Sequence, residues 1–380
     1  MKKFLKTISI LLLLVVTSYI IWSLCARVTT TKDIFPRYVL SEVENFGKNT
    51  GKGNVLALSP YLHTYDFSSQ EAYYNMFDYY LSFAQRKKLL NDTTVLILPE
   101  NIGTWLVALN EKKIVYKDTS VAEAIKSIML SNLIGYGKAY LFSQGADTRA
   151  NTVFRMKASS MAEVYQQTFS KLSKKYKITI VAGSIILPDP SIKKRKITLH
   201  YTGKLYNTTM VFDKAGNVLP QITKNKILNA KTNQFATPAM LADIPIYNTP
   251  AGKLGILIGA DAWYPENYRN LQKKQTELLI VPVCNNNNWY MGWQGYNPKN
   301  TPNDVDKNDI STITEQEAWL KYAMVGRASN TGIKNGVTVF LRGNLWYQQL
   351  EGNTLIWNKN TPAIAKPPVQ QTGSLINVWL

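Results

Sequence analysis

The sequence predicts a mixed α/β domain that follows an N-terminal transmembrane or signal segment. Two observations indicate the fold class: short apolar runs that do not alternate with polar residues, and intervening segments whose apolar residues recur at three- and four-residue steps. Buried strands that alternate with helices are typical of proteins in which helices cover the sheets. Since there is neither an internal repeat nor an obvious linker, we expect one large domain over residues 53–380 and a polar stem over residues 28–52.

Residues 1–27 are predicted to form a signal anchor or transmembrane segment. Three lysines stand among the first six residues, and an uncharged run over residues 7–26 ends at Arg27. About 20 apolar residues are enough for a helix to cross a bilayer, and Trp22 is placed for an interface. The positive-inside rule then puts the main domain outside the cytoplasm.

Two alternatives for this segment stay open. A cleaved secretory signal would give a secreted protein, although Leu24-Cys25-Ala26 is a poor match to a cleavage site. Lipid modification at Cys25 is disfavoured because the residue before it, Leu24, is bulky.

The elements of the domain are read from these patterns in chain order. Strands are predicted at residues 54–58, 94–98, 178–184, 196–201, 207–212, 254–258, 278–283 and 337–341, with a further short strand at 138–142. Helices are predicted at residues 69–90, 120–134, 161–176 and 314–332.

The chain is strongly basic. Lys and Arg outnumber Asp and Glu by 44 to 25, which gives a formal net charge of +19 and favours anionic surroundings. The lysines are spread along the chain without interleaved aromatic residues, so we expect no nucleic-acid partner. The densest cluster, residues 191–196, is predicted to be a solvated connection between strands. In one alternative, the basic surface itself is the functional part and binds anionic envelope components.

The few cysteines and histidines exclude several kinds of site. Cys25 and Cys284 are too isolated for a disulfide framework or a zinc site. The two histidines, His63 and His200, exclude a His-rich metal site, and neither stands in a recognisable Ser-His-Asp motif. We therefore expect no metal and no cofactor.

Three segments at or near predicted strand ends carry the chemistry. Glu100 follows the strand that ends at Pro99, Lys224 follows the turn at residues 213–216, and Gly259 follows the strand over 254–258. Strand ends are where α/β proteins place reactive groups.

The order and spacing of these segments resemble the nitrilase superfamily of carbon–nitrogen hydrolases over roughly residues 53–345. Glu100 matches the family's Glu, Lys224 matches its Lys, and the Arg-Ala pair at residues 327–328 resembles one in a family helix. The resemblance implies a four-layer α-β-β-α sandwich and a homodimer formed through outer helices. It also implies a site for a small amide, nitrile or acyl ligand.

In the chemistry that the resemblance implies, a carboxylate takes the proton from a cysteine thiol. The thiolate attacks the amide or nitrile carbon, and a lysine ammonium stabilises the developing charge. In this sequence Gly259 stands in the place of that cysteine, and residues 260–266 match the family's strand-to-helix elbow. Glycine cannot form the covalent intermediate, so we expect a catalytically impaired protein that retains a binding site for a small ligand or a partner protein.

Two routes would restore activity and remain alternatives. Cys284 ends the next apolar strand, which would place it near the same site if the two strands are neighbours. A water activated by Glu100 would serve in its place. The protein would then be an active extracytoplasmic amidase- or nitrilase-type hydrolase, or an acyl transferase.

Four aromatic residues and Cys284 are candidates for lining a ligand pocket. Trp263 and Tyr264 lie in the elbow, while Trp289 and Tyr290 lie in an Asn- and Gly-rich segment over residues 285–308. Long loops of this kind are often lids or binding elements.

Overall fold

Two β-sheets form the centre of the molecule, which is described by a computed structural model over residues 1–29, 38–240, 243–295 and 301–380. The first sheet contains, in order, β1 (Leu40–Phe46), β18 (Gly373–Trp379), β2 (Asn54–Ser59), β4 (Val95–Ile97), β5 (Thr179–Pro188), β8 (Leu205–Phe212) and β9 (Thr223–Lys224). The second contains β10 (Ile246–Thr249), β11 (Gly252–Ile256), β12 (Leu278–Val283), β13 (Asn335–Phe340), β16 (Leu355–Asn358) and β17 (Thr361–Ile364).

The two sheets pack face to face through one apolar cluster. Val95 and Val181 of the first sheet belong to the same buried group as Ile280 and Val337 of the second. Because both faces of each central strand are covered, these strands lack the polar alternation of a half-exposed strand. Smaller sheets lie outside this pair: β3 (Tyr61–His63) with β14 (Arg342–Leu345) and β15 (Gln348–Leu350), and β6 (Pro190–Lys193) with β7 (Lys196–Leu199).

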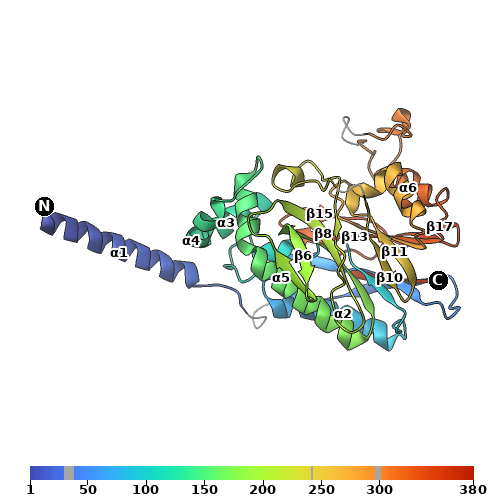
Figure 1. The fold of residues 1–380 in the computed structure, drawn as a ribbon, viewed down its shortest axis with the longest axis horizontal. Helices are drawn as coiled ribbons and strands as arrows, with labels where there is room; N and C mark the ends of the chain where they lie inside the picture. Colours follow the sequence, from blue (N-terminus) through green and yellow to red (C-terminus); the bar gives the residue numbers. More distant parts are fainter. Residues whose placement is uncertain (30–37, 241–242, 296–300) are drawn as a thin grey trace.

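Helices cover the outer face of each sheet (Figure 1). The first sheet packs on α2 (Gln70–Arg86) and α5 (Thr148–Tyr176). The second packs on α6 (Pro265–Lys273), α7 (Glu315–Tyr322) and α8 (Met324–Ala328). The expected mixed α/β fold in four layers is therefore confirmed.

Some elements differ from the sequence prediction. Asp147 caps α5 by accepting a hydrogen bond from the N–H of Ala150, so this helix begins well before residue 161. Residues 138–140, expected in a strand, belong to the helix α4 (Leu133–Tyr140), which follows α3 (Val121–Ser131). The helix expected over 314–332 is broken at Ala323, whose φ and ψ are −108° and −149°.

Part of the predicted stem lies in the first sheet. Residues Leu40–Phe46 form β1, which pairs in parallel with β18, and Val28 is buried in the core.

The N-terminal helix α1 (Lys2–Leu24) projects away from the rest of the protein (Figure 1). None of its residues is buried, and among the described residues it is the helix that is long and apolar enough to cross a membrane. It meets the domain next to α3 and α4.

Candidate functional site

Glu100 lies three residues after the end of β4, and its carboxylate lies between the strand ends of the two sheets. Its Oε1 accepts a hydrogen bond of 2.9 Å from the side-chain amide of Asn207, and its Oε2 accepts one of 2.8 Å from the backbone N–H of Cys284. Burial raises the pKa of Glu100 to about 7, although both hydrogen bonds oppose this rise, and the nearby charge of Asp261 raises the pKa further. A carboxyl group with this pKa exists in both protonation states near neutral pH.

Gly259 faces this carboxylate. It begins the short 3-10 helix Gly259–Trp263 beyond β11, and its φ of +51° is in the left-handed region that favours glycine. A Cβ atom on Gly259 would lie 2.6 Å from Oε2 of Glu100 and 3.1 Å from its Cδ. The Glu100 carboxylate therefore fills the space that a side chain at position 259 would need.

Cys284 is the first residue after β12. This strand pairs in parallel with β11, which satisfies the condition for Cys284 to lie at the same edge of the sheet as Gly259. Its backbone contacts Glu100, but burial and the charge of Glu100 raise the pKa of its thiol to about 12. The thiol is therefore neutral at physiological pH.

The ammonium of Lys224 contacts Asp189 and Tyr206. Its Nζ lies 2.8 Å from Oδ1 of Asp189 and 4.3 Å from the ring centroid of Tyr206. The hydrogen bonds that the structure describes on Glu100 come from Asn207 and Cys284, so they do not include this lysine.

The neighbouring residue, Asn225, lies on the side of the strand that faces the site. Its amide donates to the carbonyl of Ile258 at 2.8 Å, and its Oδ1 lies 3.5 Å from Nδ2 of Asn207. Successive side chains of a strand point to opposite faces, which is why Lys224 and Asn225 diverge. Sequence reasoning missed Asn207 and Asn225, and strand alternation around residue 224 is the signal that was available for Asn225.

Asp261 is a second buried carboxyl group in the same region. It accepts hydrogen bonds from the backbone N–H groups of Lys226 at 3.0 Å and Ile227 at 2.8 Å, and burial raises its pKa to about 7. A row of polar side chains thus runs from Glu100 through Asn207 and Asn225 to Asp261. Within the described residues, Oδ1 of the buried Asn207 has no hydrogen-bond partner.

A cavity of about 560 Å³ adjoins Glu100. Asn101 and Cys284 form part of its wall, and both touch Glu100 through the chain or a hydrogen bond. The rest of the lining combines aromatic with polar side chains, including Trp105, Phe154, Phe235, Trp346, Thr104 and Asn286. The indole N–H of Trp105 has no acceptor among the described residues. This mixture of apolar wall and few polar groups is typical of small-molecule sites.

The aromatic candidates lie elsewhere. Trp263 stacks on Trp293 with ring centroids 5.9 Å apart, and Trp289 packs on Phe340 at 4.7 Å, both in the core between the second sheet and its helices. Tyr264 lines a separate open hollow with Arg269 and Asp304, and Tyr290 is 57% exposed. Arg327 forms an ion pair with Asp304 at 2.5 Å. Of the five proposed lining residues, Cys284 is the one that the cavity's described lining contains.

Known proteins share this fold. An amidase of the nitrilase superfamily from Nesterenkonia sp. AN1 superposes with a TM-score of 0.53 and 12% sequence identity, over 86% of this chain and 93% of the amidase. One structure of that enzyme shows Michael addition of acrylamide at its active-site cysteine, and a cysteine variant holds butyramide.

Two sequence relatives are also of the nitrilase or amidase type, and they match this chain over shorter segments. A probable nitrilase of Schizosaccharomyces pombe is 28% identical over 123 residues, which are 32% of this chain and 39% of the relative. A deaminated glutathione amidase of Dictyostelium discoideum is 24% identical over 165 residues, 40% of this chain and 52% of the relative. The alignments thus span about half or less of each relative's length.

The family profile of carbon–nitrogen hydrolases matches residues 87–305, which is more than half of the chain and includes Glu100, Lys224, Gly259 and Cys284. The chain belongs to the carbon–nitrogen hydrolase family.

Proposed function

We propose that this chain is a membrane-anchored carbon–nitrogen hydrolase homologue that binds a small amide, nitrile or acyl ligand without covalent turnover. One observation carries the proposal: the Glu100 carboxylate occupies the space beside Gly259, 2.6 Å from where a Cβ would lie. A residue able to attack a carbonyl carbon at this elbow would collide with the general base that has to activate it.

The cavity beside Glu100 supports ligand binding. Its volume of about 560 Å³ suits a small molecule, and the side chains of Thr104 and Asn286 offer polar contacts within a largely aromatic wall. Variants of the Nesterenkonia sp. AN1 amidase, which shares this fold, hold acrylamide and butyramide, so primary amides are the first ligands to test.

The helix α1 supports a membrane anchor. Its 23 residues reach about 35 Å at 1.5 Å per residue, which spans the hydrocarbon core of a bilayer. The three lysines in its first turns, at positions 2, 3 and 6, favour a domain outside the cytoplasm under the positive-inside rule.

The proposal is tested with the full chain purified in detergent. We expect butyramide and acrylamide to bind by calorimetry or ligand-observed NMR, and no ammonia to be released from a panel of amides and nitriles. Trp105→Ala removes an aromatic side chain from the cavity wall, and it should weaken binding. Robust hydrolysis by the wild-type chain that Glu100→Ala abolishes would overturn the proposal.

A second candidate function rests on the position of Cys284. This cysteine borders the cavity and touches Glu100, so an active hydrolase or acyl transferase would use it as the nucleophile or use a water held by Glu100. An acyl-mimicking electrophile followed by mass spectrometry tests the first route. Labelling of Cys284 together with activity that Cys284→Ser removes would favour this function over the first.

A further inference from the structure

We propose that the end of α3, the helix α4 and the two residues after it form a second membrane contact, which lies against the bilayer beside α1. This surface is called the α4 platform and comprises residues 130–142. The proposal rests on the proposed anchoring by α1, and its partner is a lipid bilayer with anionic headgroups.

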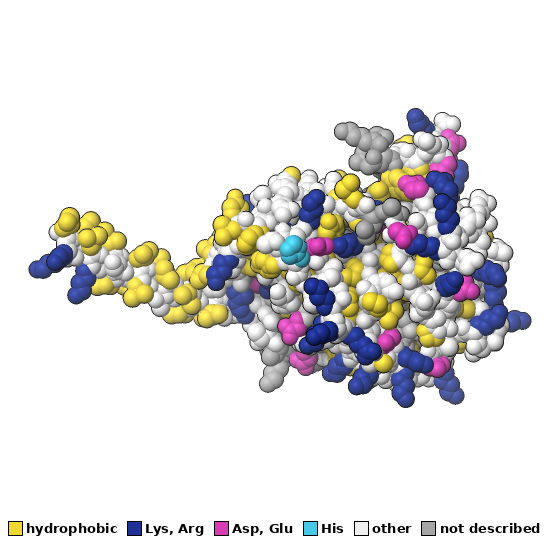
Figure 2. Space-filling model, viewed as in Figure 1, with side chains coloured by type: hydrophobic (Ala, Val, Ile, Leu, Met, Phe, Trp, Pro, Cys, Tyr) yellow, Lys and Arg dark blue, Asp and Glu magenta, His cyan; other side chains and the backbone are white. Residues whose placement is uncertain are grey.

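The α4 platform exposes an unusual share of apolar side chains. Ile134 is 56% exposed, Tyr140 54% and Leu141 78%, and Leu130, Leu133 and Phe142 are also exposed. Residues 127–143 contain a single charged residue, Lys138. Hydrophobic side chains continue from α1 onto the adjoining end of the domain (Figure 2). Contiguous exposed apolar surface marks a site of association.

Contacts with α1 determine how deep the α4 platform would lie in a bilayer that α1 spans. The hydroxyl of Tyr19 donates to the carbonyl of Leu130 at 3.0 Å and accepts from the N–H of Leu133 at 2.7 Å. The hydroxyl of Ser23 donates to the carbonyl of Ser131 at 2.7 Å. Tyr19 stands about 7 Å before the end of α1 at 1.5 Å per residue, so the junction of α3 and α4 lies level with its last turns. In a spanning helix, tyrosine and tryptophan near an end occupy the interface between lipid and water.

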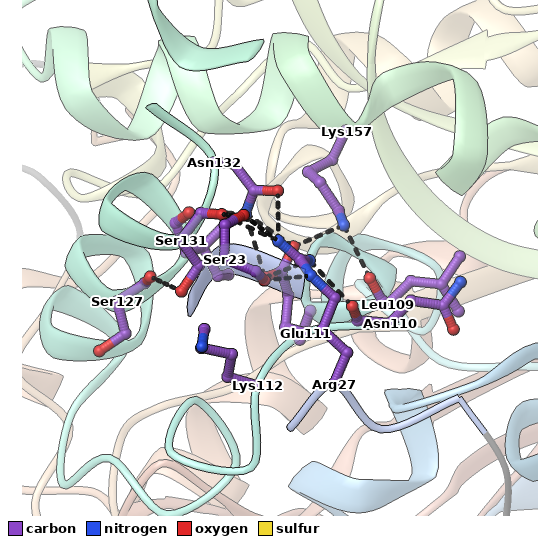
Figure 3. A network of polar contacts seen from close by, with 12 residues as sticks. Ser23, Arg27, Leu109, Asn110, Glu111, Lys112, Ser127, Ser131, Asn132 and Lys157 are labelled. Carbon is purple, nitrogen blue, oxygen red and sulfur yellow. Dashed lines mark hydrogen bonds and ion pairs between the residues drawn. The ribbon is translucent and has the colours of Figure 1, made fainter. Parts of the chain in front are cut away.

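A buried ionic cluster holds the end of α1 against the domain (Figure 3). The side chain of Glu111 is fully buried, and it pairs with Arg27 at 3.2 Å and with Lys157 at 2.7 Å. The amide of Asn132, between α3 and α4, donates to both carboxylate oxygens, and Arg27 also donates to the carbonyl of Ser131 at 2.8 Å. The cluster therefore joins the end of α1 to the junction that carries the α4 platform.

Lys112 strengthens this attachment. Its ammonium donates to the carbonyls of Trp22 and Cys25 and lies 4.0 Å from the ring centroid of Trp22. A cation at this place satisfies carbonyl groups at the helix C-terminus and interacts favourably with the helix dipole. The α4 platform thus keeps a fixed position relative to α1.

We identify a bilayer as the partner of the α4 platform because the platform adjoins α1. A helix that spans the membrane brings lipid to the level of Tyr19, which is the level at which Leu130 and Leu133 begin the platform. The exposed lysines at 126 and 138 suit anionic headgroups at the edge of such a contact.

The test uses the full chain in vesicles of neutral and anionic phospholipid. Single cysteines are introduced at Ile134, Leu141, Leu13 and Thr361 in a Cys25→Ser background and labelled with an environment-sensitive fluorophore. Leu13 reports on α1, and Thr361 on β17, at the end of the domain away from α1 (Figure 1). The Cys25→Ser protein alone measures labelling of Cys284. Quenching by nitroxide-bearing lipids reports contact with the membrane.

We expect labels at 134 and 141 to emit at shorter wavelength and to be quenched by nitroxide lipids, while the label at 361 stays as in water. Quenching at 13 without quenching at 134 and 141 would leave the anchor in place and overturn the α4 platform. Absence of quenching at 13 would instead overturn the anchor, and with it both proposals. A wavelength shift at 134 and 141 that nitroxide lipids do not affect would show that protein, not lipid, covers these positions and would also overturn the platform.

Discussion

Glu100 and Gly259 follow strands of different sheets, β4 and β11, and a Cβ atom on Gly259 would lie 2.6 Å from Oε2 of Glu100. Contacts below 3.0 Å require something to move, and Glu100 is held by hydrogen bonds from Asn207 and Cys284. The absence of a side chain at position 259 therefore leaves room for the Glu100 carboxylate.

Gly259→Ala should destabilise the protein through both backbone strain and this collision. Gly332→Ala is the matched control, because Gly332 has a φ of +73° but nothing within 4 Å of its added Cβ. We expect Gly332→Ala to lower the free energy of unfolding by about 1–2 kcal/mol, and Gly259→Ala by about 1–3 kcal/mol more. Chemical unfolding of both variants in detergent measures the difference.

Removing the carboxylate should relieve the collision. In a Glu100→Ala background the penalty of Gly259→Ala is expected to fall to that of Gly332→Ala, which a double-mutant cycle measures. Additive penalties would show that the two positions do not compete for space. For the same reason Gly259→Cys alone is not expected to produce an active site, since its Cβ meets the same oxygen.

Stability should depend on pH through Glu100. Its pKa is raised from 4.5 to about 7, so between these values the unfolded chain loses its proton while the folded protein keeps it. Stability from this group is present below pH 4.5, falls as the pH rises and is lost above about 7. Glu100→Gln should therefore gain about 3 kcal/mol relative to wild type between pH 4.5 and 8.

Unfolding curves of the two proteins across this range measure the gain. Asp261 has a similarly raised pKa but is present in both proteins, so the difference isolates Glu100. A difference that stays constant with pH would contradict the raised pKa.

Arg27→Ala should weaken the attachment of α1. Glu111 is fully buried, and loss of one cation leaves it with Lys157 alone as a charged partner within this cluster. We expect a loss of about 2–3 kcal/mol, because an incompletely compensated buried charge is costly. Lys214→Ala, which removes an exposed ion pair with Asp92, should change stability by less than about 1 kcal/mol. Equal effects of the two variants would show that the cluster contributes no more than a surface pair.

Cys284 should react slowly with iodoacetamide. Burial and the charge of Glu100 raise the pKa of its thiol to about 12, so little thiolate exists at pH 8. Mass spectrometry should show little alkylation in the wild type and faster alkylation in Glu100→Gln, because this variant lacks the negative charge. Rapid alkylation of the wild type would favour a nucleophilic role for Cys284.

The sequence predicted the mixed α/β class because buried strands and amphipathic helices leave strong local patterns, and the resemblance to the nitrilase superfamily implied the four layers. It also placed Glu100 just after a strand, and it put Cys284 near the same site on the condition that the strands over 254–258 and 278–283 are neighbours. The structure meets this condition, because β11 and β12 are parallel neighbours and end at the same edge.

Other features depended on contacts that local patterns do not contain. Lys224 and Asn225 differ by one residue, and that step decides which of them points to the site. Trp263 and Trp289 could equally line a cavity or fill the core until the packing of Trp293 and Phe340 is known. Residues 138–142 were predicted to form a strand, but residues 138–140 belong to α4, which contacts α3 and α5.

The cluster around Glu111 would also limit where the proposed ligand site meets its ligand. An anchor attached through a loose tether would let the domain sample a deep volume of solution, whereas Arg27 and Glu111 hold the domain close to the end of α1. If α1 spans a bilayer, the cavity beside Cys284 stays at a nearly constant height above it. The cavity would then meet ligands only within a thin layer above the membrane. Ligands concentrated at the membrane surface would bind more readily, because their effective concentration at the cavity is high.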